Sequence, residues 1–329
     1  MNLMKNAGQI FANLLLITIF FVLINPSYGC TAFMLKTGQG VVTGRTLDYS
    51  QPSVYSTLVY KAGETIRSVY KVTPPQSPFS WEVKHEFITV NNVLSEPQDY
   101  LVAFEGMNKA GISISGNLAT ADYPKNKTGK PTLSSDDIIR YILSRASNMN
   151  EVKSLFSSIN IDSHWQYHYI VFDAAANSLV VEFKNGEAMF YENVTQILTN
   201  NPGLDYQLSN LNNFANLKNY NFESISPTSG NEFHGAGMYG IPGDWMSPGR
   251  FIRGYFMIKE GQNYISNTEE AVNLASKIIN SVSLIKGIDL GVSEISDPIY
   301  TQLQIIKDVK NNKIYLRRYD DFEWTVVSY

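Results

Sequence analysis

An internal disulfide bond is excluded for this chain, because Cys30 is the single cysteine among its 329 residues. Charge is also scarce: 26 basic and 30 acidic residues give a net charge of −4, which argues against a nucleic-acid partner. Glycine-rich nucleotide loops, either G-x-G-x-x-G after a strand or a Walker box, do not occur. The chemistry of the chain must therefore come from its own side chains and from the one thiol.

Histidine is too sparse to indicate a metal centre. His164 and His168 have the spacing of a helical metal pair but fall at a loop-to-strand junction, and neither an H-E-x-x-H motif nor a cysteine pair is present. The G-x-S-x-G motif of serine hydrolases is also missing. We therefore expect neither a metal nor a nucleotide cofactor.

The N-terminus has the layout of a secretory signal. Lys5 precedes an uncharged apolar run over 10–24, which ends at Pro26, and Ser27 and Gly29 occupy the −3 and −1 positions of a cut before Cys30. We predict a signal peptide over 1–29, a single mature domain over 30–329, and export to the periplasm or the medium. An uncleaved membrane anchor is the plain alternative, but the run is somewhat shorter than the roughly 20 apolar residues that span a bilayer. We expect no stable membrane insertion after cleavage.

A lipoprotein signal is the alternative, because a bacterial lipobox is also cut just before a cysteine. Ser27 stands where the lipobox usually has Leu, and the bulky Tyr28 stands where it prefers a small residue. The two interpretations exclude each other chemically, since a diacylated and N-blocked Cys30 has neither a free thiol nor a free amine. A non-catalytic, lipid-anchored surface or binding protein therefore stays open as the rival hypothesis.

The order of the predicted elements indicates an α+β layered fold. Strands are predicted in two blocks, from 32 to 115 and again from 167 to 198, with three more closing the chain after 300. Helices are predicted at 138–146, 150–157, 205–217, 248–258 and 268–281, and 226–247, rich in glycine and proline, is predicted to be a long functional loop. With 44% hydrophobic residues the chain can bury a sizeable core.

A cysteine that begins the mature chain offers two catalytic groups at once. Its thiol is a nucleophile, and its α-amine titrates close enough to neutrality to accept the thiol proton. Arg45 and Asp48 lie at the end of the strand that we expect to form a hairpin with the Cys30 strand. An arginine there would favour the thiolate, and a carboxylate would orient the amine.

Two further positions are candidates, although each has a plain structural explanation. Asn200 ends a strand ahead of Pro202, from where its amide could donate to an oxyanion, but an Asn-Pro turn would look the same. Arg250 lies in the first turns of a predicted helix, where a solvated basic face is the ordinary explanation. A functional role for either residue is favoured only in combination with Cys30.

In combination, the sequence resembles the choloylglycine hydrolase family, the N-terminal-nucleophile hydrolases that include bile salt hydrolases and penicillin V acylases. Five landmarks in order carry the resemblance: the Cys30 start, G-R-T-L-D at 44–48, E-G-M-N-K-A-G at 105–111, L-T-N-N-P at 198–202 and G-I-P-G-D-W-M-S-P-G-R-F at 240–251. The resemblance implies a four-layer αββα sandwich, assembly as a homo-oligomer, commonly a tetramer, and a linear amide as substrate. It also implies that no metal or organic cofactor takes part.

The resemblance also implies roles for individual residues. Cys30 matches the nucleophile, Arg45 and Asp48 match the active-site Arg and Asp, Asn200 matches the oxyanion-hole Asn, and Arg250 matches the second Arg. Bile salt hydrolases have an Asn, and penicillin V acylases a Tyr, where an ungapped alignment places Leu118. Either Asn117 fills the second oxyanion position or a backbone amide does.

The sequence leaves the substrate open among N-acyl amides such as conjugated bile salts, penicillin V and acyl homoserine lactones. Four aromatic residues near the expected site are candidates for an apolar pocket, although core packing would explain them equally well: Tyr49, Tyr55, Tyr123 and Trp245. Leu118 argues mildly against a strict bile-salt pattern. A binding protein that keeps the fold without turnover also stays open.

Overall fold

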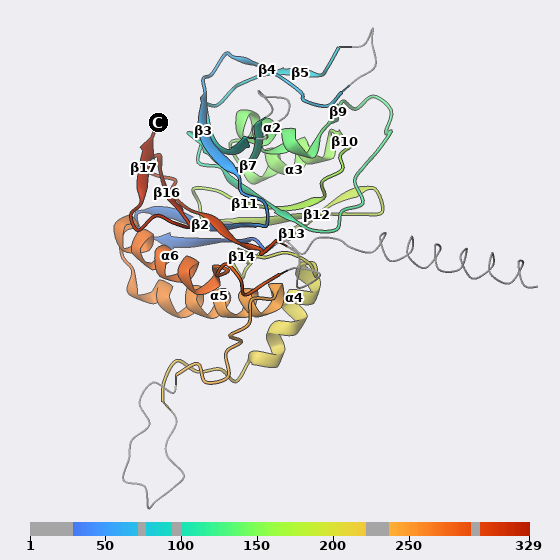
Figure 1. Ribbon diagram of the computed structural model, residues 1–329. Coiled ribbons are helices and arrows are strands. Elements are labelled where there is room, and N and C mark those ends of the chain that lie inside the picture. Colours follow the sequence, from blue (N-terminus) through green and yellow to red (C-terminus); the bar gives the residue numbers. More distant parts are fainter. Residues whose placement is uncertain (1–28, 72–76, 94–100, 222–236, 291–296) are drawn as a thin grey trace, which may run out of the picture.

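Two large β-sheets lie face to face between two layers of helices (Figure 1). The computed structural model describes residues 29–71, 77–93, 101–221, 237–290 and 297–329. Helices α5 and α6 cover one sheet and α2 and α3 cover the other, which gives the order helix, sheet, sheet, helix. The predicted αββα sandwich is therefore confirmed.

The first sheet has six strands and carries the N-terminal hairpin. Its order is β14 (Ile197–Leu198), β1 (Thr31–Thr37), β2 (Gly40–Tyr49), β15 (Tyr300–Asp308), β16 (Lys313–Arg318) and β17 (Thr325–Ser328). Strands β1 and β2 pair antiparallel, with Thr31 opposite Thr46 and Ala32 opposite Arg45. This register returns Arg45 and Asp48 to the start of β1, as the predicted hairpin requires.

The second sheet has seven strands, all paired antiparallel. Its order is β13 (Glu187–Glu192), β12 (Ser178–Lys184), β11 (Tyr167–Phe172), β8 (Ser113–Leu118), β7 (Leu101–Asn108), β6 (Phe87–Val93) and β3 (Val54–Tyr60). Two small pairs lie outside the large sheets: β4 (Thr65–Arg67) with β5 (Ser80–Glu82), and β9 (Thr132–Leu133) with β10 (Asn160–Ile161).

The helices are α2 (Ile138–Arg145), α3 (Met149–Ser157), α4 (Leu204–Leu211), α5 (Ser247–Gly261) and α6 (Thr268–Val282), with short 3-10 turns at Ser135–Asp137, Asn212–Phe214 and Gln262–Tyr264. The predicted helix at 205–217 is thus split into α4 and a 3-10 turn. Pro248 lies in the first turn of α5, where its missing N–H has no helical partner to lose. None of the described helices is long and apolar enough to cross a membrane.

Alternation along the strands builds two hydrophobic cores. On β11, Tyr169 and Val171 pack toward α2 and α3, whereas Ile170 and Phe172 pack toward the other sheet. The core between the sheets continues to α5 and α6 through residues such as Phe33 of β1. The predicted signal peptide lies outside the described residues except for Gly29, and so does the first half, 226–236, of the predicted loop at 226–247.

Candidate active site

Cys30 lies at the start of β1 with its backbone held from both sides. Its side chain is buried, with 3% of the residue exposed. The Cys30 amide nitrogen donates to Asn200 Oδ1 at 2.5 Å, and the Cys30 carbonyl accepts from Arg250 Nη1 at 2.8 Å. Asn200 follows β14, which pairs with β1, and Arg250 belongs to the first turn of α5. Three separate elements therefore fix the position of the one thiol.

Arg250 contacts four residues of this arrangement through its guanidinium. Besides Cys30, its guanidinium donates to Thr31 Oγ1 at 2.6 Å, to Asn200 Oδ1 at 3.0 Å and to the Trp245 carbonyl at 2.9 Å. Its exposed fraction is 1%, so Arg250 does not belong to a solvated basic face. Burial lowers the pKa of Arg250, while the neighbouring Asp48 acts in the opposite direction.

Asp48 is a buried carboxyl beside Gly29, the residue before Cys30. Its two oxygens accept from the hydroxyls of Thr301 at 2.6 Å and Thr46 at 3.3 Å. Burial raises the pKa of Asp48 to about 7, although Arg250, the two hydroxyls and Arg45 favour the charged form. A Cβ atom placed on Gly29 would lie 3.1 Å from Asp48 Oδ2, so the residue before Cys30 runs directly against this carboxyl.

Arg45 crosses the gap between the two sheets. Its guanidinium donates to the Gly116 carbonyl at 2.6 Å, to the Phe104 carbonyl and to Glu105 Oε2 at 3.3 Å, all on the seven-stranded sheet. The Phe104 ring lies under the same guanidinium, 5.0 Å from its centre. Arg45 is thus anchored by its far end and lines the same cavity as Cys30.

The amide oxygen of Asn200 faces Cys30, and its amide nitrogen faces the seven-stranded sheet. Its Nδ2 donates to the Leu118 carbonyl at 2.8 Å, and its backbone N–H donates to Ser247 Oγ at 3.1 Å. An amide nitrogen carries two N–H groups. In the described part of the chain, Leu118 is the one hydrogen-bond acceptor of this nitrogen, which leaves a second N–H for a ligand.

Cys30 lines a small, mainly apolar cavity of about 90 Å³. Of the four predicted pocket residues, Tyr49 and Tyr55 line it. The other aliphatic and aromatic lining residues were not foreseen: Leu47, Val102, Phe104, Leu118, Trp165 and Tyr167. Tyr55 is oriented by a 3.1 Å hydrogen bond from its hydroxyl to Gln302.

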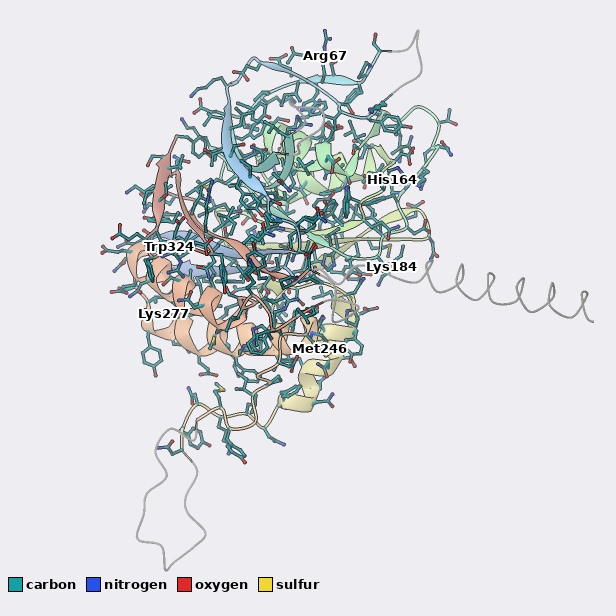
Figure 2. The ribbon with its side chains drawn as sticks, in the orientation of Figure 1. Arg67, His164, Lys184, Met246, Lys277 and Trp324 are labelled. Atoms are coloured by element: carbon teal, nitrogen blue, oxygen red, sulfur yellow. The ribbon has the colours of Figure 1, made fainter. Side chains whose placement is uncertain are left out.

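A much larger open cleft of about 950 Å³ adjoins the cavity on the Asn200 side. Trp245, the third predicted pocket residue, lines this cleft together with Gly29, Asn200 and Arg250. His164, near the seven-stranded sheet, and Met246, beside the start of α5, also line it (Figure 2). Leu118 and Trp165 line both spaces and so form the border between them.

Two predicted site residues lie elsewhere. Asn117 neighbours Leu118 on β8 but its side chain points away from the cavity, and its Nδ2 donates to the carbonyls of Leu198 and Thr199 at 3.1 and 3.0 Å. It therefore ties β8 to β14. Tyr123, the fourth predicted pocket residue, packs edge-on against Phe183 in the core beneath α2 and α3. Neither residue lines the cavity or the cleft.

The family model of linear amide C–N hydrolases, choloylglycine hydrolase family, matches residues 30–329. The chain belongs to this family. The matched range begins at Cys30, the residue around which Arg45, Asp48, Asn200 and Arg250 are gathered.

Named relatives agree with the family assignment. The chain is 29% identical to a bile salt hydrolase/transferase of Lactiplantibacillus plantarum, over 78% of this chain and 83% of the relative. It is 25% identical to a bile salt hydrolase/transferase of Clostridium perfringens, over 82% and 83%. The chain is thus a linear amide C–N hydrolase of the choloylglycine hydrolase family, similar to bile salt hydrolases.

Solved structures of this family share the fold. A conjugated bile acid hydrolase from Clostridium perfringens superposes with a TM-score of 0.75 at 22% identity, covering 91% of this chain and 92% of that one. A penicillin V acylase from Agrobacterium tumefaciens gives a TM-score of 0.71 at 20% identity, covering 91% and 86%. These two likenesses show that the chain shares its fold with both enzymes.

Proposed function

We propose that this choloylglycine hydrolase family member cleaves N-acyl amides with Cys30 as nucleophile and the α-amine of the same residue as base. The observation that carries the proposal is the convergence on Cys30: Asn200 and Arg250 bind its backbone, while Arg45 and Asp48 line its cavity. A buried cysteine in an ordinary core would not be surrounded by four polar side chains from three parts of the chain.

In the proposed reaction, the Cys30 amine accepts the thiol proton, and the sulfur attacks the amide carbonyl. The oxyanion is held by the free N–H of Asn200 and by a backbone N–H. The amine then passes its proton to the leaving nitrogen as the C–N bond breaks, which leaves a thioester. Water hydrolyses the thioester, releasing the carboxylic acid and the thiol. Arg45 favours the thiolate, Asp48 orients the amine, and Arg250 fixes the Cys30 backbone.

The mechanism requires that Gly29 be removed, because in the uncut chain the Cys30 nitrogen is an amide. The proximity of Gly29 to Asp48 supports a role for this carboxyl in receiving the new amine. We propose that export supplies the cut, with removal of 1–29 in the course of secretion to the periplasm or the medium. A short additional propeptide would be revealed by the N-terminal sequence of the mature protein.

The two spaces beside Cys30 suggest how a substrate lies. We propose that the acyl group enters the small cavity and that the amine part lies in the larger cleft, which Asn200 lines. A 150 Å³ apolar cavity accommodates benzene, so about 90 Å³ suits a compact acyl group rather than a fused steroid. A short aliphatic acyl amide, such as a short acyl homoserine lactone, therefore fits better than an aromatic acyl amide or a conjugated bile salt.

Amine release from a panel of N-acyl amides tests the function. The mature protein should hydrolyse at least one of them, and Cys30→Ala should abolish that hydrolysis while the fold is retained. A chain with one extra residue before Cys30 should be nearly as inactive, because the extra peptide bond removes the free amine. Hydrolysis that persists in Cys30→Ala would contradict the proposal.

The lipoprotein alternative is decided by the mass of the mature protein. An unmodified N-terminal Cys30 supports the hydrolase, whereas a mass increase equal to a diacylglycerol would replace the hydrolase with a lipid-anchored protein. A protein with a free N-terminal Cys30 that binds the panel without turnover would instead support a binding protein.

A further inference from the structure

An ion pair that the proposed reaction does not use is buried behind Arg45. Lys307, from β15 of the six-stranded sheet, pairs with Glu105 Oε1, from β7 of the seven-stranded sheet. The side chains are 1% and 0% exposed. Lys307 Nζ also donates to the Gly106 carbonyl at 3.1 Å. Burying two charges costs several kcal/mol per ion, so a pair at this depth calls for a specific explanation.

The same carboxylate also faces Arg45. Glu105 Oε2 accepts from Arg45 Nη1 at 3.3 Å and from Ser115 Oγ at 2.6 Å. One carboxylate is therefore shared between two basic side chains, and one of them, Arg45, lines the cavity that holds the Cys30 thiol. With Lys307 present, the carboxylate cannot cancel both positive charges.

The excess of one positive charge in this group does not depend on whether Lys307 or Glu105 holds the proton. Burial lowers the pKa of Lys307, and the charge of Arg45 lowers it further. If the proton stays on Nζ, an ammonium faces a carboxylate; if it moves to Oε1, an amine faces a carboxylic acid. In both cases Lys307 and Glu105 together are neutral, and the positive charge of Arg45 is left uncompensated.

We propose that Lys307 is a positioning residue that acts through Glu105 to leave the charge of Arg45 available to the Cys30 thiolate. Without Lys307, the carboxylate would pair with Arg45 alone and cancel the charge beside the thiol. The catalytic role of Lys307 rests on the proposed function. Its effect on the reactivity of the Cys30 thiol can be measured without turnover.

Alkylation of Cys30 by iodoacetamide near neutral pH, followed by intact mass, tests the proposal on the full chain. Because Cys30 is the single cysteine, one added mass reports this thiol alone. Lys307→Met should slow alkylation roughly three- to tenfold, since one buried charge is no longer balanced. Adding Glu105→Gln to Lys307→Met removes the unbalanced carboxylate and should bring the rate back to within about twofold of the parent protein.

The rescue separates an electrostatic role from a structural one. Damage to the fold would expose Cys30 and speed alkylation, and a second buried substitution would add to the damage. Lys313→Met, which removes an exposed lysine from β16, is the matched control and should leave the rate unchanged. The other charged or titratable groups around Cys30 stay the same in every variant: Asp48, Tyr49, Tyr55, Tyr167 and Arg250.

Two outcomes would overturn the proposal. One is a Lys307→Met variant that is alkylated as fast as the parent protein or faster, and the other is a double variant that stays as slow as Lys307→Met. Failure of the proposed function has a different signature, since it appears as hydrolysis that survives Cys30→Ala or as a thiol blocked by lipid.

Discussion

Asn200 Oδ1 accepts the Cys30 N–H at 2.5 Å although 170 residues separate the two. The contact is possible because β14, just before Asn200, pairs with β1, just after Cys30, with Leu198 opposite Ala32. Arg250 donates to both partners and locks the pair. The amide oxygen of Asn200 is therefore occupied, and its nitrogen is turned toward the border of the cavity.

Replacement of Asn200 by alanine should lower kcat about 10²- to 10³-fold with a smaller effect on KM, because its free N–H binds charge that develops only in the transition state. Asn213→Ala is the matched control. Asn213 is exposed and donates to Asn210 Oδ1 at 3.1 Å, so its loss should change kcat little. Steady-state kinetics of amine release measure both variants. An Asn200→Ala enzyme with raised KM and unchanged kcat would contradict the oxyanion role.

In the uncut chain, which has no α-ammonium at Cys30, Asp48 should make the protein less stable as the pH rises from about 4 to about 7. Its pKa is about 7 in the folded protein, against an ordinary value of 3.8, so the folded state holds a proton that the unfolded state has lost. This contribution to stability is complete below the unfolded value and is lost as the pH passes through the folded value. Asp48→Asn should flatten the pH dependence of Tm over this interval.

Asp320→Asn is the control for that measurement, because Asp320 is exposed and the same loss of a carboxylate should leave the slope unchanged. An Asp48→Asn protein whose Tm falls with pH as steeply as that of the parent would show that Asp48 titrates in its ordinary range.

Arg250→Lys should destabilise the protein by about 2 to 4 kcal/mol and remove most activity, because a single ammonium cannot replace a planar guanidinium that serves four acceptors. Arg253→Lys provides the comparison. Arg253 also binds three backbone carbonyls, those of Ser281, Pro242 and Asp244, and none of these hydrogen bonds goes to Cys30.

Chemical unfolding and amine release distinguish the two arginines. Both variants should lose stability, and the Arg253→Lys enzyme should keep its activity per folded molecule. Equal loss of activity in the two would mean that Arg250 acts only by supporting the fold.

Acyl size should decide substrate preference. We expect higher kcat/KM for compact acyl amides than for conjugated bile salts, because the cavity at Cys30 is about 90 Å³. Trp165→Ala, at the border of cavity and cleft, should shift the ratio toward the larger acyl group, whereas Tyr206→Ala, in the cleft alone, should not. A parent enzyme that prefers bile salts would contradict this orientation of the substrate.

Local patterns were sufficient for part of this description. The hairpin turn and strand alternation place Arg45 and Asp48 beside Cys30, and the family resemblance supplied the αββα sandwich. The lining residues Val102 and Trp165 carry no local signal, since they meet Cys30 only when the second sheet packs against the first. Thr301, which binds Asp48, lies 253 residues further along the chain.

Asn117 shows why a motif alone cannot assign a side chain. It lies next to Leu118, but neighbouring residues of a strand point to opposite faces, and Asn117 bonds to β14 and Thr199 instead of facing the cavity. The sequence also did not predict that Lys307 pairs with Glu105, because Lys307 lies 201 positions after Gly106, whose carbonyl it binds.

The most direct test of the central claim is the intact mass of the mature protein, quenched in acid during turnover of an N-acyl amide. We expect the N-terminus to be Cys30 and a fraction of the protein to gain the mass of the acyl group. Digestion of the quenched protein should locate that group on the peptide that contains Cys30. Cys30→Ala should gain nothing. A mature protein that turns over substrate without beginning at Cys30, or that carries the acyl group elsewhere, would contradict the account.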